Sequence, residues 1–199
     1  MDLSPKNVNK WHRQLCQVTP WLFISGDLNG NRELALIQLT EWNDAGITDI
    51  IDVRGEWSDE EFVAAHSPNI HYHYLGTHDD GIAQDEAWFR AGIEAMESAL
   101  SNPAAKLMVH CHMGINRGPS MAFAMMLAQG FEPIEALNAI RAARPIAGII
   151  YAQDALRSIR AIKMLDPDQN DTEISEVQSW FETNYIDVGT IIRRIRSAS

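Results

Sequence analysis

The pattern of apolar and polar residues divides the chain into alternating strands and helices. Short apolar runs predict strands at residues 21–24, 47–53 and 107–109. Residues 70–75 (IHYHYL) alternate between apolar and polar side chains, which indicates a strand with one more polar face. Apolar residues at helical spacing predict a series of helices, at residues 32–45, 60–65, 85–100, 121–129, 133–141 and 149–164.

The apolar run at residues 47–53 is rich in β-branched side chains, which is typical of a central strand buried on both faces. It ends at Arg54, Gly55 and Glu56, where α/β folds keep their ligand crevice. Arg54 could hold an anionic substrate, although an ion pair with an acidic neighbour is the preferred interpretation. The expected fold class is α/β, with a central mixed, mostly parallel sheet flanked by helices.

Residues 106–120 (KLMVHCHMGINRGPS) carry the strongest chemical signal. The apolar run before Cys111 predicts a strand, and Pro119 suits the first turn of a helix because its missing N–H has no partner there. A short loop joins the two. Its backbone N–H groups and the helix dipole form an anion site, so we predict a phosphate-binding loop between a strand and a helix.

The residue types in this loop suit phosphate chemistry. Loop amides, the helix N-terminus and a nearby guanidinium all stabilise the thiolate form of Cys111. Arg117 can hold two phosphate oxygens with its planar fork, and Gly114 allows a close backbone approach. Alternatively, Cys111 is a small buried hydrophobe and Arg117 a solvated residue. The spacing of His110, Gly114 and Arg117 around the cysteine disfavours that interpretation.

The segment from Cys111 to Arg117 resembles the Cys-x5-Arg signature of the protein tyrosine phosphatases, and the chain length is similar to their compact dual-specificity branch. The resemblance implies that Cys111 attacks phosphorus and that no metal or other cofactor is needed. It also implies that the phosphate is bound by the loop residues that follow the cysteine: His112, Met113, Gly114, Ile115, Asn116 and Arg117.

A general acid is expected on the loop at residues 76–84 (GTHDDGIAQ), because the departing oxygen must be protonated. Asp79 and Asp80 are the candidates. The resemblance implies an acid about thirty residues before the nucleophile, just before a helix that opens with paired aromatics, here Trp88 and Phe89. Counting back from that pair favours Asp79, but Asp80 stays open.

Two positions depart from the family pattern. Gly118 stands where the family has Ser or Thr, whose hydroxyl eases departure of the thiolate; Ser120 could substitute, or the second step could be slow. Ile149 and Ile150 stand where relatives often have Pro-Asn, so loop support is expected from His110 or Ser120. Gly118 also keeps open a non-catalytic phosphate-binding protein as an alternative.

Composition and charge restrict the partners and the cellular compartment that we expect for this chain. The 199 residues carry a formal charge of −11, which disfavours nucleic acid and anionic membranes as partners. The N-terminus lacks the apolar core of a signal peptide, and a catalytic thiolate needs a reducing compartment, so we expect a cytoplasmic monomer without a structural disulfide. A metal site is not expected either, although His71 and His73 share a strand face with His66 and His78 nearby.

The function expected is that of a protein tyrosine or dual-specificity phosphatase acting on phosphotyrosine and also phosphoserine or phosphothreonine in proteins. Soluble inositol or sugar phosphates and RNA 5′-triphosphates are the alternative substrates. We assign residues 1–165 to the catalytic domain. Residues 166–199 are expected to form an acidic linker (166–173) and a C-terminal extension of one or two amphipathic helices (174–195), which packs on the domain, forms a dimer contact or binds a partner.

Overall fold

The computed structural model describes residues 12–164 and 167–198, whose strands form one mixed sheet. Four neighbouring strands are parallel, and the short first strand pairs antiparallel at the edge. The strand order is β1-β2-β5-β3-β4. This is the α/β fold predicted above. The strand bounds are Cys16–Gln17 (β1), Leu22–Ser25 (β2), Asp49–Arg54 (β3), His71–Thr77 (β4) and Leu107–His110 (β5).

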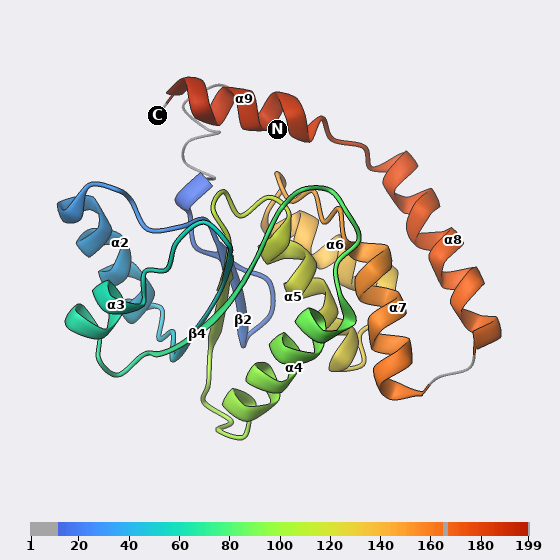
Figure 1. Cartoon of the computed structure of the whole chain (residues 1–199), viewed down its shortest axis with the longest axis horizontal. Helices are drawn as coiled ribbons and strands as arrows, with labels where there is room; N and C mark the ends of the chain where they lie inside the picture. Colours follow the sequence, from blue (N-terminus) through green and yellow to red (C-terminus); the bar gives the residue numbers. More distant parts are fainter. Residues whose placement is uncertain (1–11, 165–166, 199) are drawn as a thin grey trace.

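Helices cover both faces of this sheet (Figure 1). On one face lie α2 (Arg32–Asp44) and α3 (Glu60–His66). The other face is covered by four helices: α4 (Glu86–Leu100), α5 (Arg117–Ala128), α6 (Pro133–Ala143) and α7 (Ala152–Lys163). The predicted helix starts of α2 and α4 are capped, because the side chains of Asn31 and Asp85 accept backbone N–H groups of the first turn.

The core lies in two layers because successive strand residues face opposite sides of the sheet. Ile51 and Val109 pack in the larger layer under α4 to α7, whereas Ile50 and Met108 pack under α2 and α3. Every residue of β3 is buried, which confirms the predicted central strand. Burial on both faces fixes the register of β3 and β5, and thereby the position of the loops at their ends.

The C-terminal segment forms two helices, α8 (Pro167–Thr183) and α9 (Val188–Ala198). The prediction of a linker at residues 166–173 was wrong, because α8 already begins at Pro167. Proline suits the first helical turn, and acidic residues near a helix N-terminus are favoured by its dipole. The helix packs back on the domain along α6 and α7, where Val177 is buried and Trp180 Nε1 donates to Asn138 Oδ1 at 2.8 Å (Figure 1).

The last helix, α9, lies across the end of the sheet where the parallel strands finish (Figure 1). Its buried Ile191 and Ile195 form a small apolar cluster with Met113, Ile115 and Ile146. Among the residues that the structure describes, no helix has the length and apolar character needed to cross a membrane.

Candidate active site

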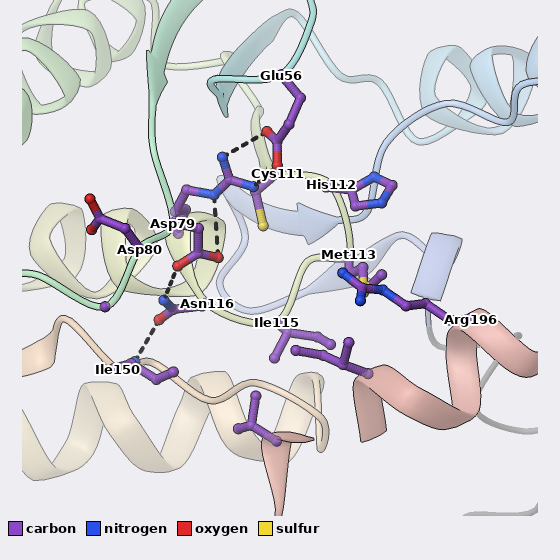
Figure 2. Close-up of a pocket in the computed structure, with 14 residues that line it drawn as sticks. Glu56, Asp79, Asp80, Cys111, His112, Met113, Ile115, Asn116, Ile150 and Arg196 are labelled. Carbon is purple, nitrogen blue, oxygen red and sulfur yellow. Dashed lines mark hydrogen bonds and ion pairs between the residues drawn. The ribbon is translucent and has the colours of Figure 1, made fainter. Parts of the chain in front are cut away.

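The carboxyl ends of the parallel strands bring together loops that are far apart in the sequence. Cys111 follows β5, Glu56 follows β3 and Asp79 follows β4. All three line a cavity of about 390 Å³ whose floor holds the 2% exposed Cys111 (Figure 2). This volume lies in the range typical of small-molecule sites.

The loop after Cys111 is held by its carbonyl groups. The fully buried Arg144 donates from Nε to Gly114 O at 2.5 Å and from Nη2 to Met113 O at 3.1 Å. Gly114 has a φ of 59°, and a Cβ atom there would lie 2.6 Å from Ser25 O. Glycine is therefore required at this position.

The amide side of the same loop is left free. Between residues 112 and 116, no backbone N–H donates a hydrogen bond to another atom in the part of the chain that the structure describes. Buried N–H groups without partners are rare in proteins. Together with the N-terminus of α5, they are the donor set that an anion would satisfy.

Arg117 is buried and oriented by two partners. Its Nη2 and Nη1 donate to the two carboxylate oxygens of Glu56 at 2.7 and 2.8 Å, and Nη1 also donates to Thr77 O at 2.8 Å. The hydrogen bonds from Arg117 lower the pKa of Glu56, so the pair stays ionised. Arg117 Nε donates no hydrogen bond to a described residue, but it faces the Asp79 carboxylate at 3.4 Å, so a bidentate anion would bind the Nε–Nη2 edge in place of that ion pair.

Asp79 is held at the mouth of the cavity and Asp80 is not. The Oδ1 atom of Asp79 accepts from Asn116 Nδ2 at 2.7 Å and from the hydroxyl of Tyr151 at 2.8 Å, while Oδ2 lies 3.4 Å from Arg117 Nε (Figure 2). Among the described residues, the Asp80 side chain accepts a hydrogen bond only from the backbone N–H of Ile82, in its own loop. The structure therefore ties Asp79 to the loop after Cys111 and to α7, whereas it shows no such tie for Asp80 among the described residues.

Tyr151 is a functional candidate that sequence reasoning missed, because the helical pattern shows only which face of the helix a residue occupies. Burial and then the hydrogen bond to Asp79 raise the pKa of its hydroxyl, which stays protonated and remains a donor. The same oxygen accepts the N–H of Gly81 at 3.3 Å. Tyr151 therefore ties the acid loop to the start of α7.

Asn116 was predicted to bind phosphate; its backbone N–H belongs to the free donor set of the loop, while its buried side chain connects neighbouring loops. Its Oδ1 accepts the Ile150 N–H at 2.7 Å and the Ser120 hydroxyl at 3.3 Å. The expected support by Ser120 is present. His110 donates to no described residue; burial lowers its pKa, so it stays neutral beside Trp42.

Two further loop residues have side chains outside the anion site. Met113 and Ile115 pack into the apolar cluster under α9, so only their backbone can contact a phosphate.

His112 lies on the rim, where its Nδ1 donates to Asp27 Oδ2 at 2.7 Å. His12, Asp27 and His112 bring possible metal-ligand atoms within 4.8 Å of one another, but Asp27 also lies 3.3 Å from the Arg13 guanidinium, which opposes cation binding.

The remaining candidates have structural roles. Arg54 is fully buried and paired with Asp52 at 2.9 Å and Asp59 at 2.7 Å, so the ion-pair interpretation is confirmed. His71 and His73, on the edge strand β4, both lie near the carboxylate of Asp49 on the neighbouring strand β3.

Cys16 and Cys111 are both free thiols.

The sequence of this chain is similar to those of known phosphatases over part of its length. No family model matches the sequence. Dual specificity protein phosphatase 26 of Rattus norvegicus is 32% identical over 92 residues, which cover 45% of this chain and 42% of the relative. Its Bos taurus counterpart is 28% identical over 91 residues, with the same coverage. The chain thus matches less than half the length of these curated relatives.

Solved structures share the fold over more of the chain. A mouse putative dual specificity phosphatase superposes with a TM-score of 0.62 at 19% identity, covering 77% of this chain and 92% of its own. Human DUSP28 superposes with a TM-score of 0.60 at 19% identity, covering 75% and 97%. At this identity the structures establish a common fold.

Proposed function

The chain is a protein similar to the dual-specificity phosphatases of the protein tyrosine phosphatase superfamily, and we propose that it is a cysteine-dependent phosphomonoesterase. The observation that carries the proposal is the convergence of Cys111, Arg117 and the carboxylate of Asp79 on one cavity. These residue types can supply a nucleophile, an anion-binding group and a proton donor for phosphoryl transfer.

The reaction proceeds in two steps. The Cys111 thiolate forms a bond to phosphorus as the bond to the leaving oxygen breaks, and Asp79 transfers its proton to that oxygen. Asp79 then removes a proton from water, which attacks phosphorus and releases the thiolate. The loop amides and the Nε–Nη2 edge of Arg117 stabilise the charge on the non-bridging oxygens in both transition states.

The walls of the cavity favour phosphotyrosine as substrate. Ile150, Val188 and Ile192 line the cavity that holds the buried Cys111. An aromatic ring gains free energy from contact with apolar walls, and its length lets the phosphate reach a recessed thiol. Protein phosphotyrosine is therefore preferred over phosphoserine and phosphothreonine, whose shorter side chains make less of this contact.

The test is hydrolysis of an aryl phosphate under reducing conditions, without added metal, by the wild type and three variants. Cys111→Ser should abolish turnover and Asp79→Asn should lower it by about a hundredfold, in the range found for general acids. Asp80→Asn is the matched control on the same loop and should retain turnover. Normal turnover by Cys111→Ser would disprove the mechanism.

Gly118 supports a second candidate, a phosphate-binding protein that turns over very slowly. A Cβ atom at Gly118 would lie 3.4 Å from the backbone N of Cys111, so a hydroxyl-bearing residue would fit where none is present. Rapid-mixing kinetics separate the two candidates. A single burst of product without steady turnover supports the phosphate-binding protein with very slow turnover, and steady turnover supports the enzyme.

A further inference from the structure

The C-terminal helix α9 forms one wall of the active-site cavity. Val188, Ile192 and Arg196 of this helix line the cavity together with residues of the loop after Cys111 (Figure 2). Ile191 and Ile195, on the neighbouring face of the helix, are 4% and 1% exposed. Their contacts with the loop hold the wall in place, so α9 contributes fixed chemistry to the site.

Arg196 gives this wall a positive charge. Its side chain is exposed and extends from α9 toward the cavity, on the opposite side of Cys111 from Asp80 (Figure 2). Among the described residues, no carboxylate forms an ion pair with Arg196. Arg193 differs, because it donates to Thr190 Oγ1 at 2.6 Å and does not line the cavity.

Three carboxylates also line the cavity, and two of them, Glu56 and Asp79, are paired with Arg117. The third is that of Asp80, and the whole chain carries a formal charge of −11. Since Arg117 is buried and bonded to Glu56, Arg196 is the arginine at the mouth that is available to an incoming group. A guanidinium binds carboxylates and phosphates through paired N–H groups.

We propose that Arg196 binds a second anionic group of the substrate, on a residue close in sequence to the phosphotyrosine whose phosphate binds at Cys111. The inference rests on the proposed function and names its substrate class, a phosphotyrosine peptide with an acidic or phosphorylated neighbour. Without Arg196 the surrounding carboxylates would repel such a peptide. A single arginine therefore decides whether acidic peptides are preferred or rejected.

The experiment measures kcat/KM for three phosphotyrosine peptides of equal length, with neutral flanking residues, aspartate flanks or phosphothreonine flanks. The wild type should prefer the two anionic peptides over the neutral one by roughly three- to tenfold, as expected for a partly exposed charge pair. The larger preference identifies carboxylate or phosphate as the second group. Added salt should reduce the preference by screening.

Variants assign the preference to this residue. Arg196→Ala should reverse it, so that the neutral peptide becomes the better substrate, and Arg196→Lys should keep part of it through the retained charge. Arg193→Ala, on the same helix, is the control and should keep the wild-type preference. Thermal melts of each variant check that α9 still packs.

The outcomes separate this inference from the proposed function. If the wild type hydrolyses all three peptides without preference, or if Arg196→Ala keeps the preference, Arg196 does not bind the substrate. If the wild type hydrolyses none of them and no simple aryl phosphate either, the proposed function itself is wrong.

Discussion

Replacing Tyr151 by Phe tests whether this residue acts through the general acid. The change removes one hydroxyl and keeps the ring, which packs in the core. The lost hydrogen bond, at 2.8 Å to Asp79 Oδ1, is to an ionisable group. Such bonds contribute about 1.5–3 kcal/mol, equivalent to a roughly ten- to hundredfold change in rate. Because Asn116 still holds the same oxygen, we expect the lower end, about a tenfold fall in kcat.

The assay compares aryl phosphates whose leaving groups differ in basicity. A nitrophenolate leaves readily without a proton, whereas phenol requires one. Tyr151→Phe should therefore slow phenyl phosphate more than nitrophenyl phosphate. A double-mutant cycle adds a second criterion, because Tyr151→Phe should change little in an Asp79→Asn background. Tyr185→Phe, at a hydroxyl-bearing residue that is 77% exposed, is the control.

Two results would refute this account of Tyr151. An equal loss for both substrates would mean that the hydroxyl does not act through protonation of the leaving group. A full loss in the Asp79→Asn background would mean that Tyr151 supports the site independently of Asp79, through its bond to Gly81 or through α7.

Three further predictions concern other parts of the site and the fold. Glu56→Gln should lower kcat/KM about three- to tenfold, because Arg117 loses the carboxylate that orients it; the effect is moderate since the pair is partly exposed. An unchanged kcat/KM would contradict this orienting role of Glu56. Gly118→Ser should raise steady turnover and shrink the initial burst in rapid-mixing kinetics, and an unchanged burst would show that thiolate departure from Cys111 does not limit the rate. Burial lowers the pKa of His12 to about 4 from 6.5, so the unfolded chain binds more protons between these values and stability falls as the pH is lowered through them. Urea unfolding should show a loss of about 2 kcal/mol between about pH 6.5 and pH 5, and His12→Gln should remove it; an identical pH dependence in both proteins would count against the account.

The sequence alone determined the chemistry that depends on neighbouring residues. The strand before Cys111, the loop, and the helix after it lie within one short segment, so the spacing of Gly114 and Arg117 is sufficient to predict an anion site. Local rules failed at residues 166–173, because acidic composition is shared by linkers and by helix N-termini.

Only the tertiary structure decided how distant residues complete the site. The sheet order places Glu56 and Thr77 beside Arg117, although both come from earlier strands. The helical pattern gave no indication of a partner for Tyr151, whose hydroxyl reaches Asp79 because α7 packs beside the loop that carries Asp79. The pattern of residues 174–195 predicted one or two amphipathic helices but not the surface that they would cover. The helix or strand repeat determines the face of its own element on which a side chain lies. Which other side chains it contacts depends on how the elements pack, and that packing is determined by the whole core.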